Sequence, residues 1–75
     1  MLLDELKVGA TASVIKTGGE GRVRRHLLDM GITPGAEIYL RKRAPFGDPI
    51  EITIRGYELS LRKDEAHCIE AEEKA

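Results

Sequence analysis

The residues best suited to chemistry lie near the end of the chain, where Asp64, Glu65, His67 and Cys68 place carboxylate, imidazole and thiol groups within five positions. Such groups are common ligands of transition metals. Their spacing argues against a metal site, because His67 and Cys68 are adjacent and would point to opposite faces of a strand. The chain also lacks the paired cysteine and histidine spacings of structural zinc sites. We therefore expect no metal ligands and no cofactor.

A glycine cluster at residues 18–21 resembles a loop that could cradle a phosphate at the start of a helix. It lacks the lysine and hydroxyl residue of a phosphate-binding loop and carries Glu20 where an anion would lie. Ser13 and Ser60 lack the glycine spacing of a nucleophile elbow. These patterns predict neither a nucleotide site nor a catalytic residue, so we do not expect an enzyme.

The basic run at residues 22–26 is the clearest candidate for a binding surface. In a helix its apolar residues would share one face, which leaves Arg22, Arg25 and His26 pointing outward. Those apolar residues are Val23, Leu27 and Met30. The basic groups form either a solvated face or a docking patch for an acidic partner, because arginine pairs bidentately with carboxylates.

Two aromatic residues are candidates for the same kind of role. Phe46 lies between Pro45 and Gly47 in a turn-rich segment, and Tyr39 has the outward parity of its predicted strand. Aromatic side chains at such positions can anchor a protein partner. Either residue could instead cover one end of a barrel.

Composition narrows the class of protein. Lys+Arg 12 against Asp+Glu 13 gives a net charge of -1, and only three residues are aromatic, which argues against nucleic-acid binding. A chain of 75 residues has room for one core, so we expect a single domain over residues 1–75. No signal peptide and no apolar run of about 18 residues is present. With a single cysteine, these features favour a cytoplasmic protein that reaches a membrane only through a partner.

Closely spaced turn residues separate short alternating stretches, which is typical of a small all-β barrel. We predict strands at residues 11–16, 37–44, 50–54, 57–61 and 68–72, and helical turns at 2–6 and 64–67. Residues 21–30 form a helix that Gly31 and Pro34 terminate. The expected fold is therefore mainly β, a small SH3-like five-stranded barrel with one short helix inserted between the first two strands. Its predicted core consists of Val14, Val23, Leu27, Ile38, Leu40, Ile52, Ile54, Leu59, Leu61 and Ile69.

Two motifs carry a family resemblance. They are Leu27-x-Asp29-Met30-Gly31-Ile32-x-Pro34-Gly35 and Gly47-Asp48-Pro49-Ile50. With further matches along essentially the whole chain, the sequence resembles the ferrous iron transport protein A family. The resemblance implies a bacterial or archaeal accessory protein that docks on the cytosolic GTP-binding part of the membrane ferrous iron transporter, protein B, and modulates it. It would act as a monomer or weak homodimer.

Other functions stay open. The same barrel is similar to the C-terminal domain of iron- and manganese-dependent repressors, which suggests a regulatory domain acting with such a repressor. A weak iron carrier is a third possibility, although few ligands converge. An arginine of the helix could also act on nucleotide bound to the transporter.

Overall fold

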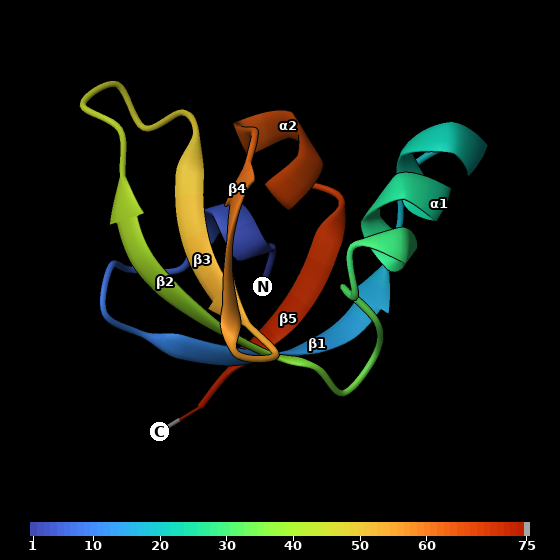
Figure 1. Ribbon diagram of the computed structural model, residues 1–75, viewed down its shortest axis with the longest axis horizontal. Coiled ribbons are helices and arrows are strands. Elements are labelled where there is room, and N and C mark those ends of the chain that lie inside the picture. Colours follow the sequence, from blue (N-terminus) through green and yellow to red (C-terminus); the bar gives the residue numbers. More distant parts are fainter. Residues whose placement is uncertain (75) are drawn as a thin grey trace.

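The structure is a computed structural model in which residues 1–74 are described. The chain forms, in order, the 3₁₀ turn η1 (Leu3–Glu5), β1 (Thr11–Thr17), α1 (Gly21–Asp29), β2 (Glu37–Arg43), β3 (Ile50–Ile54), β4 (Tyr57–Leu61), α2 (Lys63–Ala66) and β5 (Ile69–Glu73) (Figure 1). The predicted class is confirmed, with five strands in one sheet and one helix between the first two strands. The predicted helical turns correspond to η1 and α2.

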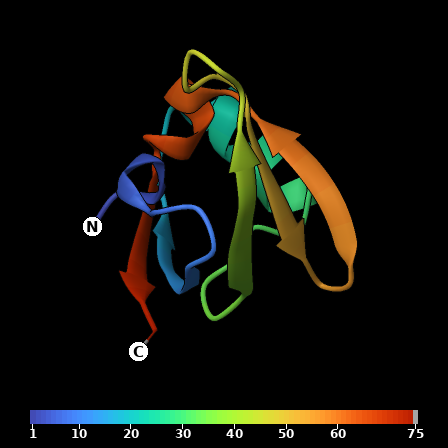
Figure 2. The same cartoon turned by 90° about the vertical axis from the view of Figure 1, so that its left-hand side faces the viewer.

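The five strands form one antiparallel sheet in the order β4-β3-β2-β1-β5. Figure 2 shows the sheet curving around the core, with β1 and β5 on one side and β3 and β4 on the other. The last strand begins one residue later than predicted. The Cys68 N–H donates to the Glu65 carbonyl at 3.0 Å, so this residue completes the last turn of α2 instead.

Because side chains alternate along each strand, most apolar residues lie on the face of the sheet that covers the core. Ile50, Ile52 and Ile54 of β3 are at most 1% exposed, as the period of two requires. Eight of the ten predicted core residues are buried, and Leu59 is partly buried. The prediction omitted Leu3, Leu6 and Ile32, which are also fully buried.

One inward assignment, that of Val23, was wrong. Val23 is 39% exposed, whereas Leu27 is the residue of α1 that is buried in the core. Val23 lies one turn earlier, beside Gly19 at the start of the helix, where α1 extends away from the sheet (Figure 1). Tyr57 is 44% exposed, and its hydroxyl donates to the Met30 carbonyl at the end of α1.

Candidate functional site

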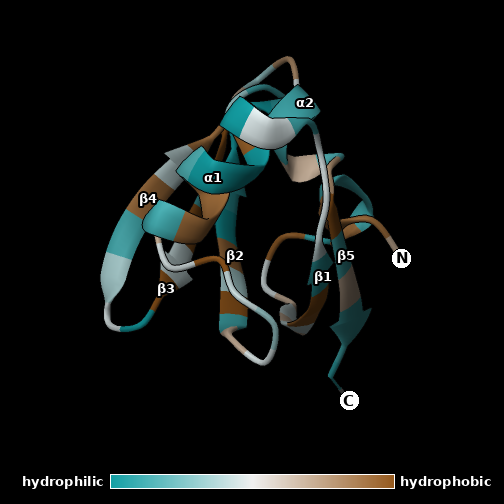
Figure 3. Ribbon diagram, turned by 90° about the vertical axis from the view of Figure 1, so that its right-hand side faces the viewer, coloured by the Kyte–Doolittle hydropathy of each residue, from teal (hydrophilic) through white to brown (hydrophobic). Residues whose placement is uncertain are grey.

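The basic residues predicted to bind a partner lie together on α1. Arg22, Arg25 and His26 are exposed and, with Asp29, line a shallow hollow of about 500 Å³; we call the three basic residues the α1 patch. Figure 3 shows α1 largely in hydrophilic colours on the outside of the molecule. No ion pair within residues 1–74 involves a member of the patch. The patch can therefore offer charge-assisted hydrogen bonds to carboxylates of another protein.

The neighbouring Arg24 has a different position. Its Nε donates to the Thr17 carbonyl at 3.1 Å, which ties α1 to the end of β1. At the other end of the helix, the Tyr57 hydroxyl contacts Met30, and the Ile32 N–H donates to the Leu27 carbonyl at 3.1 Å. These contacts hold the short helix at both ends, so the α1 patch is presented on a fixed element.

The two aromatic candidates lie apart from the α1 patch. Phe46 is 98% exposed at the tip of the β2–β3 loop, which is at the left of Figure 1 while α1 is at the right. Tyr39 is 43% exposed on β2 and lines a separate hollow with Thr53 and Arg55. The outward parity predicted for Tyr39 is correct. The five candidate residues thus occupy three places and do not form one continuous site.

One hollow was not predicted from the sequence. A groove of about 810 Å³ lies between α1 and α2, beside the end of β4. We call it the α1–α2 groove; it is lined by Val23, His26, Asp48, Pro49, Ser60, Arg62, Asp64 and Glu65. No spacing in the sequence brings these residues together, since they come from four segments that only the fold assembles.

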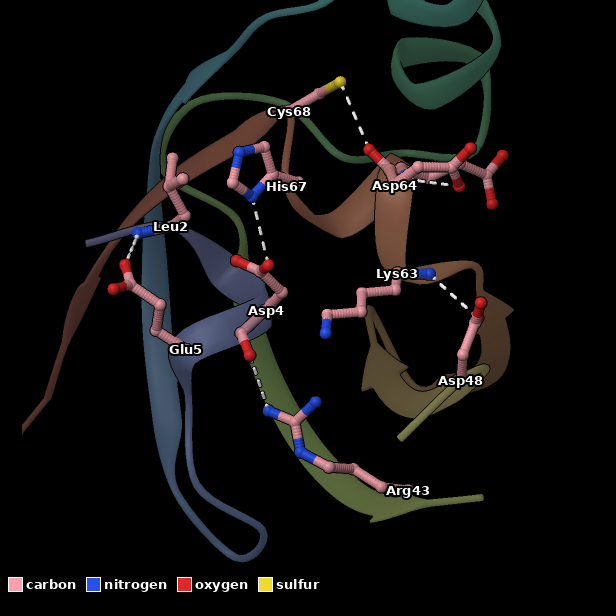
Figure 4. A network of polar contacts seen from close by, with 10 residues as sticks. Leu2, Asp4, Glu5, Arg43, Asp48, Lys63, Asp64, His67 and Cys68 are labelled. Carbon is pink, nitrogen blue, oxygen red and sulfur yellow. Dashed lines mark hydrogen bonds and ion pairs between the residues drawn. The ribbon is translucent and has the colours of Figure 1, made fainter. Parts of the chain in front are cut away.

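Polar contacts join the N-terminal turn to α2 and β2 (Figure 4). Asp4 Oδ2 lies 3.1 Å from His67 Nδ1, and a guanidinium nitrogen of Arg43 donates to the carbonyls of Asp4 and Leu6 at 2.8 and 2.5 Å. The backbone N–H of Lys63 donates to Asp48 Oδ1 at 2.9 Å. These contacts tie the N-terminal turn, the β2–β3 loop and α2 together. Among the residues that make them, Asp48 also lines the α1–α2 groove.

The carboxylate, imidazole and thiol groups near the end of the chain do not converge. His67 Nδ1 faces Asp4, whereas the Cys68 thiol lies 3.4 Å from the Asp64 carbonyl. Within residues 1–74, no group of three or more His, Cys, Asp or Glu residues is arranged to hold a metal ion. None of the helices described there has the length and apolar character needed to cross a membrane.

We expect ferrous iron to find no tight site on this chain. Anaerobic calorimetric titration should show no one-to-one binding of sub-micromolar affinity, because the soft and carboxylate ligands face different partners. A one-to-one site of that affinity, lost in a Cys68→Ser variant, would contradict this prediction and would support an iron carrier instead.

Comparison with known proteins agrees with a small SH3-like β-barrel. The zinc-complexed FeoA of Stenotrophomonas maltophilia, described as an SH3 domain protein, superposes with a TM-score of 0.85 at 24% identity, over 96% of this chain and 89% of that one. A manganese-dependent transcriptional repressor superposes with a TM-score of 0.91 at 20% identity, over 99% of this chain and 36% of that one. At these identities the likeness concerns the fold alone.

The FeoA domain profile matches residues 1–73, and the chain belongs to the FeoA domain family. A FeoA-like protein from Clostridium acetobutylicum is 47% identical over 96% of this chain and 84% of its own, with a TM-score of 0.90. The Fe(2+) transport protein A/Fe(2+) transporter FeoB fusion protein of Porphyromonas gingivalis is 38% identical over 72 residues, or 96% of this chain. The chain spans only 8% of the length of that fusion protein. The predicted family is confirmed.

Proposed function

We propose that this protein is a cytoplasmic, non-enzymatic accessory factor of ferrous iron uptake. In this role it docks on the cytosolic GTP-binding part of the membrane ferrous iron transporter FeoB and modulates that transporter. Residues 1–75 act as a single domain, in a monomer or weak homodimer, which does not bind nucleic acid and does not insert directly into the membrane.

The fused relative is the observation that carries this proposal. In the Porphyromonas gingivalis protein, a segment 38% identical to this chain and the transporter FeoB are parts of one polypeptide. Fusion raises the effective concentration of one module near another, which favours pairs that work in contact. The likeness to repressors concerns the fold alone and adds no support for a role in transcription.

The α1 patch is the surface that we propose for this docking. Its basic groups are exposed on a helix held at both ends, and no acidic side chain of the described chain pairs with them. Arginine is enriched among the residues that dominate protein interfaces. Phe46, with its ring almost fully exposed, is the rival anchor, and Tyr39 marks a third surface.

A pull-down tests the docking directly. The full chain, immobilised as bait, should retain the soluble cytosolic domain of the transporter, and the amount retained should differ between the GTP-bound and nucleotide-free domain. The barrel of a manganese-dependent repressor is a matched control, since it shares the fold at 20% identity. The proposal would be overturned if the chain retains the domain neither with GTP nor without nucleotide. It would also be overturned if the control barrel retains as much of the domain as this chain does.

A further inference from the structure

One edge of the sheet is free to accept another strand. Among the strands of residues 1–74, β4 is the end strand of the sheet and pairs only with β3. Arg55 and Gly56 have φ angles of 51° and 83°. Two successive positive φ angles are typical of a two-residue hairpin turn, whose flanking residues exchange both backbone hydrogen bonds. Ile54 and Tyr57 are therefore a hydrogen-bonded pair, and the alternation continues along the strand.

This alternation decides which backbone groups point outward. Tyr57, Leu59 and Leu61 bond to β3, so the N–H and C=O groups of Glu58 and Ser60 point away from the sheet. No loop or helix described in residues 1–74 supplies a backbone partner for these groups. Ser60 also lines the α1–α2 groove. The free edge thus borders a hollow large enough to hold a few extended residues.

The charges of the groove indicate what kind of segment fits there. Asp48, Asp64 and Glu65 line it against the single guanidinium of Arg62, and none of the three forms an ion pair within residues 1–74. Each uses one oxygen to accept a backbone N–H, at 2.8 to 2.9 Å. The remaining charge is negative, and Val23 and Pro49 add apolar surface.

We propose that the α1–α2 groove binds an extended, basic segment of a partner protein, which adds a strand to β4 at Glu58 and Ser60. Main-chain hydrogen bonds to the edge supply affinity, and side chains on alternate residues supply selectivity. A lysine or arginine of the segment pairs with Asp64 or Asp48, and a neighbouring apolar residue covers Val23 and Pro49. A second copy of this chain is disfavoured, because two negative grooves would face each other.

This inference is independent of docking through the α1 patch, which selects an acidic surface. The two sites lie on different sides of α1 and share only His26, which lines both hollows. A variant with Arg22→Glu and Arg25→Glu should therefore still bind a basic segment in the groove. Loss of docking through the α1 patch and loss of binding in the groove can thus be recognised separately.

The test uses an acetylated and amidated six-residue peptide of alternating valine and lysine, titrated into the ¹⁵N-labelled full chain. We expect the amide signals of Glu58 and Ser60 to shift and their hydrogen exchange to slow. A peptide with glutamate in place of lysine should bind at least about tenfold more weakly, because like charges meet in the groove. Equal binding of both peptides, or signal changes confined to α1, would overturn the proposal.

Two matched changes show whether the backbone edge makes the contact. Ser60→Pro removes an outward N–H, which an edge strand tolerates, whereas Ser60→Ala keeps it. The proline variant should lose binding and the alanine variant should retain it. If the proline variant does not fold, lysine–valine peptides N-methylated at every second amide, in either register, are tested on the unchanged chain. Strand addition would be contradicted if both methylated peptides bind as well as the unmethylated peptide, or if the folded proline variant binds the peptide as well as the parent. Self-association of the chain through β4 in the absence of peptide would also contradict the proposal.

Discussion

Replacement of Ile52 by alanine is expected to lower the free energy of unfolding by about 2–5 kcal/mol. Ile52 is 0% exposed at the middle of β3, opposite Leu40 of β2 and Leu59 of β4. Truncation removes apolar contacts and leaves a cavity that three hydrogen-bonded strands cannot collapse. Domains have about 0.05–0.15 kcal/mol of stability per residue, so the loss is a large share of what this chain can have.

Urea unfolding measures this effect. The midpoint should fall while the slope of the transition stays the same, since the fold does not change. Thr53→Ala is the control, because Thr53 is the next residue of β3, points to the other face and is only partly buried. Its cost should stay within about 1 kcal/mol. Coincident midpoints of Ile52→Ala and the parent would show that the described core is incorrect.

Reversal of charge on the α1 patch is expected to have the largest effect on partner binding. A variant with Arg22→Glu and Arg25→Glu should bind the cytosolic domain of the transporter at least tenfold more weakly, about 1.4 kcal/mol. Both side chains are exposed and form no ion pair within residues 1–74, so the variant should fold like the parent. Binding of the parent should also depend more strongly on salt.

A control separates the position of these charges from their number. Lys7→Glu with Lys16→Glu makes the same change in net charge at two exposed positions outside α1. Calorimetry at two salt concentrations should show near-parental affinity for this control. Equal weakening in both double variants would indicate long-range electrostatics and not a docking patch. If Phe46→Ala abolishes binding while the α1 variant binds normally, the loop is the docking surface and the α1 patch is a solvated face.

The strands could be predicted from the sequence because their side-chain period is local. Ile50, Ile52 and Ile54 alternate strictly with polar residues, so one face of their strand is apolar. That face is buried in the core, and its burial does not depend on which strands are its neighbours. Arg55-Gly56 between two alternating stretches likewise predicts a tight hairpin. The family motifs and the outward position of the α1 patch also follow from residue type and spacing.

The sites between segments depended on the path of the chain. Asp4 meets His67 across 63 positions, and the α1–α2 groove joins side chains of four segments, so no local period could predict either. Val23 shows the same limit within one helix. Its spacing from Leu27 places both on one face, but the sheet covers only the later turn of α1. Residue spacing therefore predicts which side chains share a face. What covers that face depends on where distant elements pack, and that is visible only in the folded chain.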